Sequence, residues 1–135
     1  MKNIKVFIEM ASDGFFSAYM DDTPMDYSCI GTGKTVKETI DDFYGGYEAL
    51  RKVYQERGEA FEEAAFTFYY EDAVTFLHSL KDVFTMAGIS RITGINRKQL
   101  GHYLSGYRRP AEKTARKIQE GIIAYLTDLQ SVRFK

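Results

Sequence analysis

The stretch GINRKQLGHYLSGYRRP, residues 94–110, gathers the side chains of this chain that could do recognition chemistry. It places Arg97, Lys98, Gln99, His102, Arg108 and Arg109 among a few apolar residues and three glycines. Such side chains bind phosphates and base edges when a helix presents them to a nucleic acid. The same composition also occurs on an ordinary basic surface helix. The two interpretations can be distinguished by the other residues of the stretch. A helix that is positioned to bind nucleic acid also requires apolar residues and glycines at particular positions, whereas an ordinary surface helix does not.

Charge is divided unequally along the chain. Residues 1–85 contain 8 Lys and Arg against 16 Asp and Glu, and residues 86–135 contain 10 against 3, although the net charge of all 135 residues is -1. The basic part suits a polyanion such as nucleic acid, which the acidic part would repel. This asymmetry predicts two parts of the chain with different partners.

The segment CIGTGKTVKET is similar to a phosphate-binding loop but lacks its spacing. The motif G-x-x-x-x-G-K-[ST] needs a glycine five residues before Gly33, and that residue is Ser28. Thr35 and Glu38 instead have the spacing of a capping box, which accounts for the threonine without a nucleotide. We therefore expect no nucleotide site here.

The remaining polar residues do not support catalysis. Carboxylates such as Asp41 and Glu62 lie at positions expected on solvated surfaces, whereas metal-assisted chemistry needs several that converge. The two histidines, His78 and His102, have no evident Ser or Cys nucleophile beside them. The single Cys29 excludes an internal disulfide framework and a cysteine-based zinc site, and we expect it to be buried. We predict no enzyme, no metal and no cofactor.

Composition indicates a globular protein outside the membrane. Hydrophobic residues make up 44% and charged residues 27%, and no apolar run approaches the roughly 20 residues that span a bilayer. The N-terminal MKNIKVFIEM is too short and too alternating for a secretory signal. We expect a cytoplasmic protein without membrane contact.

Strand and helix patterns divide the chain into two parts. In the first, alternation predicts strands over 3–10 and 15–20 with a hairpin at Asp13-Gly14, then a short strand YSCI that runs into a GTG turn. A loop containing Pro24 lies between the second and third strands. Apolar residues four and three apart predict a helix from Thr35 to Gly58, with close packing or a bend at Gly45-Gly46, and AAFTFYY predicts a fourth strand.

From Asp72 onward only helices are expected, over 72–84, 86–93, 97–105 and 111–132. We therefore predict an α+β protein with domains 1–71 and 72–135. Domains this small are marginally stable alone, so the units pack together or oligomerise. The apolar stripe of the last helix is an obvious adhesive surface, although it could equally close the helical core. Its members are Ala111, Ala115, Ile118, Ile122, Ile123, Tyr125, Leu126, Leu129 and Val132.

The segment MAGISRITGINRKQLGHYLS meets the positional constraints of a twenty-residue helix-turn-helix. Ser90 supplies the small residue at the fifth position, and Gly94 supplies the positive φ that the turn needs at the ninth. Asn96 can cap the second helix. The fourth, tenth, fifteenth and eighteenth positions must be apolar, and they are Ile89, Ile95, Leu100 and Tyr103.

With the following LSGYRRPAEKTARKI, where Gly106 ends one helix and Pro110 starts the next, residues of about 73–125 resemble the lambda-repressor/Cro-like (XRE) helix-turn-helix family. The resemblance implies sequence-specific binding of double-stranded DNA, with the second motif helix in the major groove. It implies base contacts by Asn96, Arg97, Lys98, Gln99 and His102, and phosphate contacts by Tyr107, Arg108, Arg109 and Lys113. Gly101 departs from expectation, because glycine inside a helix costs stability.

The first part resembles HicB-type antitoxins, whose N-terminal domain has a partial RNase H-like fold. The matching segments are IKVFIEM, the hairpin SDG, FFSAYM and CIGTGKTVKETIDDF. The resemblance implies an all-α helix-turn-helix domain after a β-β-β-α-β domain, and an antitoxin that masks a small basic RNase toxin and represses its own operon. An acidic first part would attract a cationic toxin.

Alternatives stay open at this point. The chain could be an orphan regulator whose first domain oligomerises or senses another partner. The second domain could be a helical bundle with an incidental basic face, or a helix-turn-helix kept as a protein-docking scaffold. For the DNA-binding interpretation we expect a homodimer or larger homo-oligomer, because two-fold half-sites need a two-fold protein.

Overall fold

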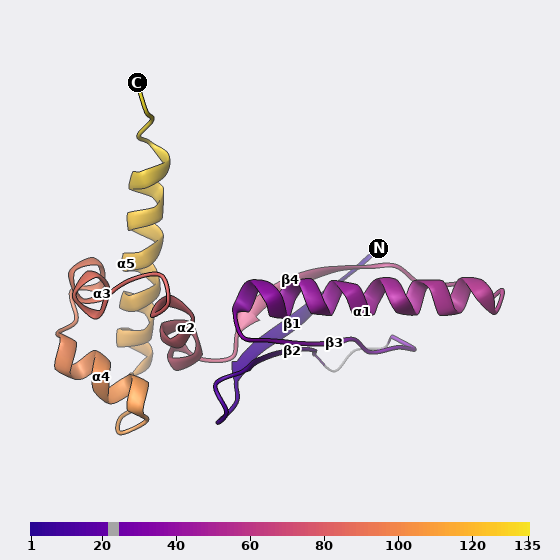
Figure 1. Ribbon diagram of the computed structural model, residues 1–135, viewed down its shortest axis with the longest axis horizontal. Helices are drawn as coiled ribbons and strands as arrows, with labels where there is room; N and C mark the ends of the chain where they lie inside the picture. Colours follow the sequence, from indigo (N-terminus) through magenta and orange to yellow (C-terminus); the bar gives the residue numbers. More distant parts are fainter. Residues whose placement is uncertain (22–24) are drawn as a thin grey trace. The chain divides into compact units, whose positions relative to one another are not determined.

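The computed structural model describes residues 1–21 and 25–135, and it divides the chain into Met1–Glu71 (unit 1) and Asp72–Lys135 (unit 2). The described residues form a four-stranded mixed sheet and five helices, which confirms the α+β class (Figure 1). The loop predicted around Pro24 lies outside the described residues.

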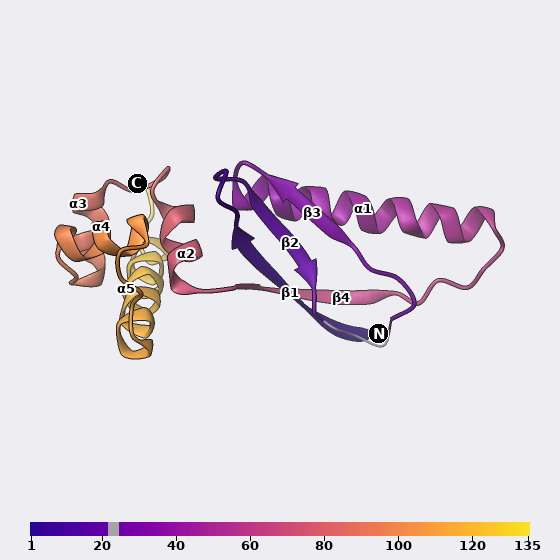
Figure 2. The ribbon, with the colours of Figure 1, turned by 90° about the horizontal axis from the view of Figure 1, so that it is seen from below.

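Unit 1 contains a sheet with the strand order β3-β2-β1-β4 (Figure 2). The strands are β1 (Lys2–Met10), β2 (Phe16–Met20), β3 (Ile30–Gly33) and β4 (Ala64–Tyr70). β2 runs antiparallel to both neighbours, and β4 runs parallel to β1. The predicted hairpin joins β1 to β2: Gly14 has φ 87°, and the Phe15 N–H donates to Asp13 Oδ1 at 2.9 Å.

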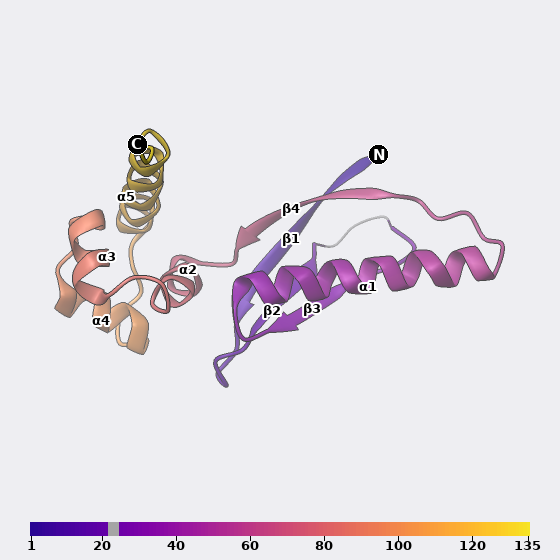
Figure 3. The ribbon, with the colours of Figure 1, turned by 45° about the horizontal axis from the view of Figure 1, so that its top comes forward.

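Helix α1 (Val36–Glu56) covers one face of this sheet (Figure 3). Alternation places Ile4, Val6 and Ile8 of β1 on that face, where all three are buried with Phe43 and Tyr47 of the helix. The aromatic residues of β4 that point the same way pack edge-on against α1, with the rings of Phe43 and Phe66 4.9 Å apart. Among the described residues of unit 1, no helix lies on the opposite face of the sheet.

The ends of α1 follow the prediction except for one hydrogen bond. Thr35 Oγ1 accepts from the Glu38 N–H at 3.1 Å, and Gly58 ends the helix with φ 67°. The Glu38 carboxylate accepts from the backbone N–H of Lys34 at 3.0 Å, one residue before the position that a capping box requires. Within the segment GKT, Gly33 ends β3 and Thr35 is the N-cap of α1.

The prediction for the third strand is wrong in its position. β3 is IGTG, so the glycines expected in a turn lie within the strand, and Cys29 before it is buried as expected. A Cβ at Gly31 would lie 2.4 Å from the Thr39 carbonyl oxygen, and one at Gly33 would lie 2.8 Å from the Thr39 nitrogen. These glycines let β3 approach the backbone of α1, a contact that local sequence does not reveal.

The expectation of close packing at Gly45-Gly46 of α1 is wrong. α1 continues through both residues (Figure 1). A Cβ at Gly45 would meet nothing within 4 Å, and one at Gly46 would make an ordinary contact at 3.5 Å with the Ile30 carbonyl oxygen. The close approach is made by the glycines of β3.

Unit 2 consists of α2 (Ala73–Leu80), α3 (Met86–Thr93), α4 (Arg97–Ser105) and α5 (Glu112–Gln130). α2 is shorter than the predicted 72–84, because the chain turns after Leu80 and Thr85 then caps α3 by accepting from the Gly88 N–H at 3.0 Å. Pro110 lies two residues before α5, whose N-cap is Ala111. The buried core of the unit contains Leu77, Ile89, Ile95, Leu100, Tyr103 and Ile118.

The predicted stripe of α5 is divided between two environments. Ile118 and Ile122 are buried, and a Cβ at Gly121 would lie 2.6 Å from the Ile92 carbonyl oxygen, so this part of α5 packs directly against α3. The second half of α5 extends beyond the other helices of the unit (Figure 1). There Ile123, Leu126 and Leu129 are exposed, as is Val132, which lies two residues after the end of the helix. The stripe closes the core with its first half alone.

Candidate nucleic-acid interface

Helices α3 and α4 are joined by the turn that the sequence predicts. Gly94 adopts φ 74°, which a residue with a Cβ reaches only with strain, and its N–H donates to the Ser90 carbonyl at 2.8 Å. Ile95 after it is buried. Asn96 caps α4, since its Oδ1 accepts from the Gln99 N–H at 2.8 Å. The direction of α4 is thereby set by backbone geometry, burial and a cap together.

One side of α4 is held in the core and the other is open. Leu100 and Tyr103 are buried, and Leu104 packs against the same core. Residues three and four apart share a helix face, so Lys98, Gly101, His102 and Ser105 lie on the side opposite the core. We call these four residues the α4 face. Lys98 and Ser105 are exposed, and Gly101 and His102 are partly exposed.

The candidate base-contacting residues are not equally free. Arg97 and Lys98 are exposed and form no ion pair within the described part of the chain. Asn96 uses its side-chain oxygen for the cap. Gln99 lies at the edge of the α4 face, and its Nε2 donates to the Tyr103 hydroxyl at 2.6 Å. The amide oxygen and the second amide N–H of Gln99, with the amide nitrogen of Asn96, are groups left for a ligand.

Residues Gly106–Pro110 form a corner that is fixed to the end of α4. Gly106 has φ 81°, and its N–H donates to the Tyr103 carbonyl at 3.2 Å. The Arg108 N–H donates to the His102 carbonyl, also at 3.2 Å. The ring of Tyr107 lies 4.8 Å from that of His102. The structure therefore brings Tyr107 and Arg108 next to the α4 face.

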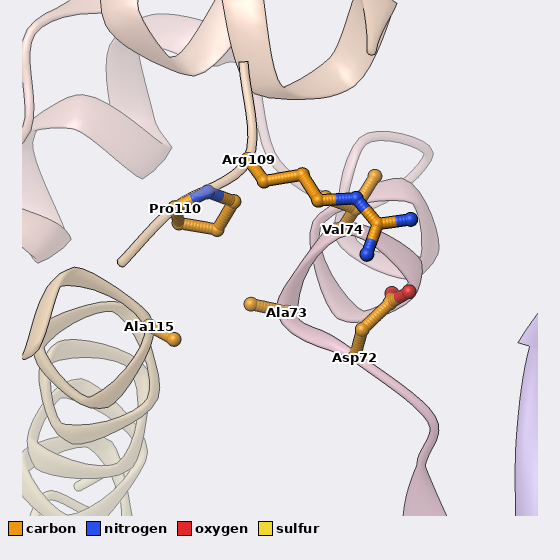
Figure 4. Close-up of a pocket in the computed structure, with 6 residues that line it drawn as sticks. All are labelled: Asp72, Ala73, Val74, Arg109, Pro110 and Ala115. Carbon is orange, nitrogen blue, oxygen red and sulfur yellow. The ribbon is translucent and has the colours of Figure 1, made fainter. Parts of the chain in front are cut away.

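Arg109 points elsewhere. It lines a pocket of about 210 Å³ with residues of α2 and the start of α5, and its guanidinium group is directed toward the carboxylate of Asp72 (Figure 4). Asp72 itself caps α2, because its Oδ1 accepts from the Thr75 N–H at 2.8 Å. Of the predicted phosphate contacts, Arg109 is thus set beside a negative charge, whereas Lys113 is exposed on the first turn of α5.

Gly101 has no structural partner that explains it. A Cβ at this position would meet nothing within 4 Å, so the fold does not require glycine here. An alanine would be more stable in a helix by about 1 kcal/mol. The residue stands between Lys98 and His102 on the α4 face, where a missing side chain lets another molecule approach the helix backbone.

Ser105 is not among the residues predicted for the site, although its hydroxyl is part of the α4 face. Its Oγ donates to the His102 carbonyl at 3.2 Å and accepts from the Tyr107 N–H at 3.3 Å. It lies three residues after His102, so helical periodicity could have found it. Its hydroxyl joins α4 to the corner.

No group of three or more His, Cys, Asp and Glu side chains is placed to hold a metal ion in residues 1–21 and 25–135. Within the same residues, no helix combines the length and apolar character needed to cross a membrane. Comparison of the chain with protein-family models, with curated proteins and with solved structures found no match.

Proposed function

We propose that unit 2 binds double-stranded DNA through α4 and acts as a sequence-specific transcriptional regulator. The observation that carries the proposal is the α4 face, which is held away from the core on a helix whose ends are both capped. Its residues and the adjoining Arg97 and Arg108 offer donors for base edges and phosphates. Unit 2 contains 11 Lys and Arg against 5 Asp and Glu, so its charge favours a polyanion.

The resemblance to Cro-like helix-turn-helix proteins supports the same proposal. The motif's apolar positions are all buried, its turn glycine has positive φ, and its second helix is capped by Asn96. An incidental basic helix would not need this combination. In the proposed mode α4 enters the major groove, Arg97, Lys98 and Gln99 contact base edges, and Tyr107, Arg108 and Lys113 contact phosphates.

The test is a mobility-shift assay on the DNA upstream of the protein's own coding sequence, with scrambled duplex as competitor. Arg97→Ala is expected to reduce the difference in affinity between the upstream duplex and the scrambled duplex, because one base contact discriminates between sequences by about 1–3 kcal/mol. Arg108→Ala is expected to weaken both DNAs equally and to lower the salt dependence by about one phosphate contact. Arg57→Ala, at the end of α1 in unit 1, is the control. Unchanged duplex binding in both unit 2 variants would show that α4 is not the DNA-binding element.

A second candidate function, an antitoxin that also binds a basic protein, is favoured by unit 1. The unit contains 7 Lys and Arg against 14 Asp and Glu. On the sheet face opposite α1, the strand registers align Tyr69, Phe7, Tyr19 and Ile30 in one row across all four strands. The Phe7 ring lies 5.9 Å from that of Tyr19 and 6.2 Å from that of Tyr69.

Acidic groups border this row. The Tyr19 hydroxyl donates to the Glu71 carboxylate at 2.5 Å, and this bond is the main reason that the pKa of Tyr19 is raised to about 12. Glu9 lies two residues farther along β1 than Phe7, on the same face of the sheet. An apolar row with carboxylates at its border suits a cationic protein surface. In this proposal the partner is a small basic RNase toxin, as the resemblance to HicB-type antitoxins implies.

The test needs a neighbouring gene that encodes a small basic protein. Ile30→Lys and Tyr69→Lys are expected to abolish its copurification with the full chain while DNA binding persists, since both place positive charge in the row. Val53→Lys on α1 is the control, because Val53 is also exposed but lies away from the row. An orphan regulator would have no such gene beside it, and its unit 1 variants would lose nothing in this assay.

A further inference from the structure

The second half of α5 exposes an apolar face that the fold of unit 2 leaves uncovered. Ile122 is 3% exposed and ends the buried part of the stripe, whereas Leu129 is 52% and Val132 70% exposed. Ile123 and Leu126 lie on the same protruding segment and are also exposed. We call Ile123, Leu126 and Leu129 of α5, together with Val132 just after its end, the α5 face. Large contiguous apolar surface of this kind marks an interaction site.

The charge pattern of the segment indicates what covers it. Residues 121–132 contain a single charged side chain, Asp128, and the next is Arg133. DNA would require Lys and Arg here, and a strongly basic or acidic protein would require opposite charges. A two-fold interface instead sets a patch against its own copy, which only a patch of low or self-complementary charge tolerates. One Asp and one Arg near the same end of the face satisfy that condition.

We propose that the α5 face is the surface through which two copies of this chain associate. The face continues the buried stripe of Ile118 and Ile122 without a break in its spacing, so each copy of α5 extends its own core into the interface. Tyr125 connects the two parts, since its ring lies 6.0 Å from that of Phe84 in the unit core. The pairing would bring two copies of α4 into one particle. That this arrangement serves DNA binding rests on the proposed function, whereas the pairing itself does not.

The experiment is sedimentation equilibrium of the full chain without DNA, from about 1 to about 100 µM, the range in which interfaces of modest size dissociate. The wild-type chain is expected to be a dimer at the upper end. Leu126→Glu combined with Leu129→Glu is expected to raise the dissociation constant at least about 100-fold, because two apolar contacts are replaced by desolvated charges. Val83→Glu is the matched control, since Val83 is 76% exposed in the segment between α2 and α3 of the same unit. A wild-type chain that stays monomeric, or a double variant that dimerises as the wild type does, overturns the proposal.

A covalent test does not depend on how the double variant folds. In a Cys29→Ser background, Leu129→Cys on the α5 face is expected to form a disulfide-linked dimer under mild oxidation. Ala124→Cys is the control, because Ala124 is exposed on the same helix and none of the residues three or four positions away from it belongs to the α5 face. Equal crosslinking of the two variants overturns the proposal. Loss of DNA binding in a chain that still dimerises would instead refute the proposed function alone.

Discussion

Gln99 and Tyr103, one turn apart on α4, are joined by a hydrogen bond in which the glutamine amide donates to the phenol at 2.6 Å. The ring of Tyr103 is buried in the core of unit 2, whereas Gln99 lies at the edge of the open α4 face. The bond satisfies the hydroxyl of a core residue and fixes the orientation of a side chain that faces outward. It couples the core of the unit to the proposed interface.

Tyr103→Phe tests this coupling. Removing the hydroxyl is expected to lower the free energy of unfolding by about 0.5–1.5 kcal/mol, the usual net contribution of one hydrogen bond. The freed Gln99 amide should discriminate bases less well, so the affinity for the preferred duplex should fall several-fold more than that for scrambled duplex. Fluorescence anisotropy with both duplexes measures the difference. Equal losses on both DNAs would show that Gln99 does not contribute to sequence preference.

Gly101→Ala separates the stability of α4 from its proposed contact. The free energy of unfolding of the variant is expected to be about 0.5–1 kcal/mol higher than that of the wild type, because alanine favours the helix and its Cβ meets open space. Its affinity for duplex DNA is expected to fall at least about threefold, since the methyl group would occupy the closest approach of the ligand. Thermal unfolding and anisotropy measure the two effects.

Gly45→Ala is the matched control for this substitution. Gly45 also lies within a helix, and a Cβ there also meets nothing within 4 Å, but it belongs to unit 1. It should raise stability by a similar amount and leave DNA affinity unchanged. If Gly101→Ala stabilises the chain and binds DNA as tightly as the wild type, the α4 face does not contact DNA at that position.

His78 is expected to make the stability of unit 2 depend on pH. Its Nε2 lies 3.1 Å from the Leu104 carbonyl oxygen, and its Nδ1 is buried without a hydrogen-bond partner among the described residues. Burial lowers the pKa of His78, Lys81 lowers it further, and the Leu104 carbonyl and Asp72 oppose the shift. Below its ordinary pKa of about 6.5, the unfolded chain takes up a proton that the folded chain resists.

The contribution of His78 is therefore complete above about pH 6.5 and is lost as the pH falls toward its lowered folded value. The melting temperature should fall between about pH 7.5 and about pH 5.5. His78→Gln, which retains a donor for the Leu104 carbonyl, should melt with a shallower dependence over the same range. An identical pH profile for the two proteins would place the titration elsewhere in the chain.

Asp72→Asn tests whether the carboxylate restrains Arg109. Asparagine also caps helices, so α2 should keep its start and the stability should change little. Without the negative charge toward which its guanidinium points, Arg109 would add to the attraction for DNA (Figure 4). The affinity for any duplex should rise about two- to threefold at low salt and less at high salt. An affinity that falls would show that Asp72 supports the DNA-binding surface.

Much of the fold follows from local pattern in the sequence. The alternation in β1, the positive φ of Gly94 and the caps Thr35 and Asn96 involve residues close in sequence, and the structure confirms each of them. The buried positions of the helix-turn-helix motif are confirmed for the same reason, because helical periodicity alone decides which side of α4 is apolar. The sequence alone therefore predicts which side of α4 forms the proposed site.

Other features depended on residues distant in sequence, and these only the tertiary structure decided. IGTG forms a strand by pairing with β2, and its glycines leave room for the backbone of Thr39 and Phe43 in α1. Arg109 points toward Asp72, which lies 37 positions earlier in the sequence. The stripe of α5 is uniform in sequence, yet it is buried only in the half of the helix that packs against α2 and α3. The sequence determined which residues are apolar, charged or able to turn, because these are properties of single residues and their near neighbours. Packing decides which of these residues are buried, which are paired and which stay exposed. Packing therefore distinguishes the α4 face and the α5 face from the rest of the surface.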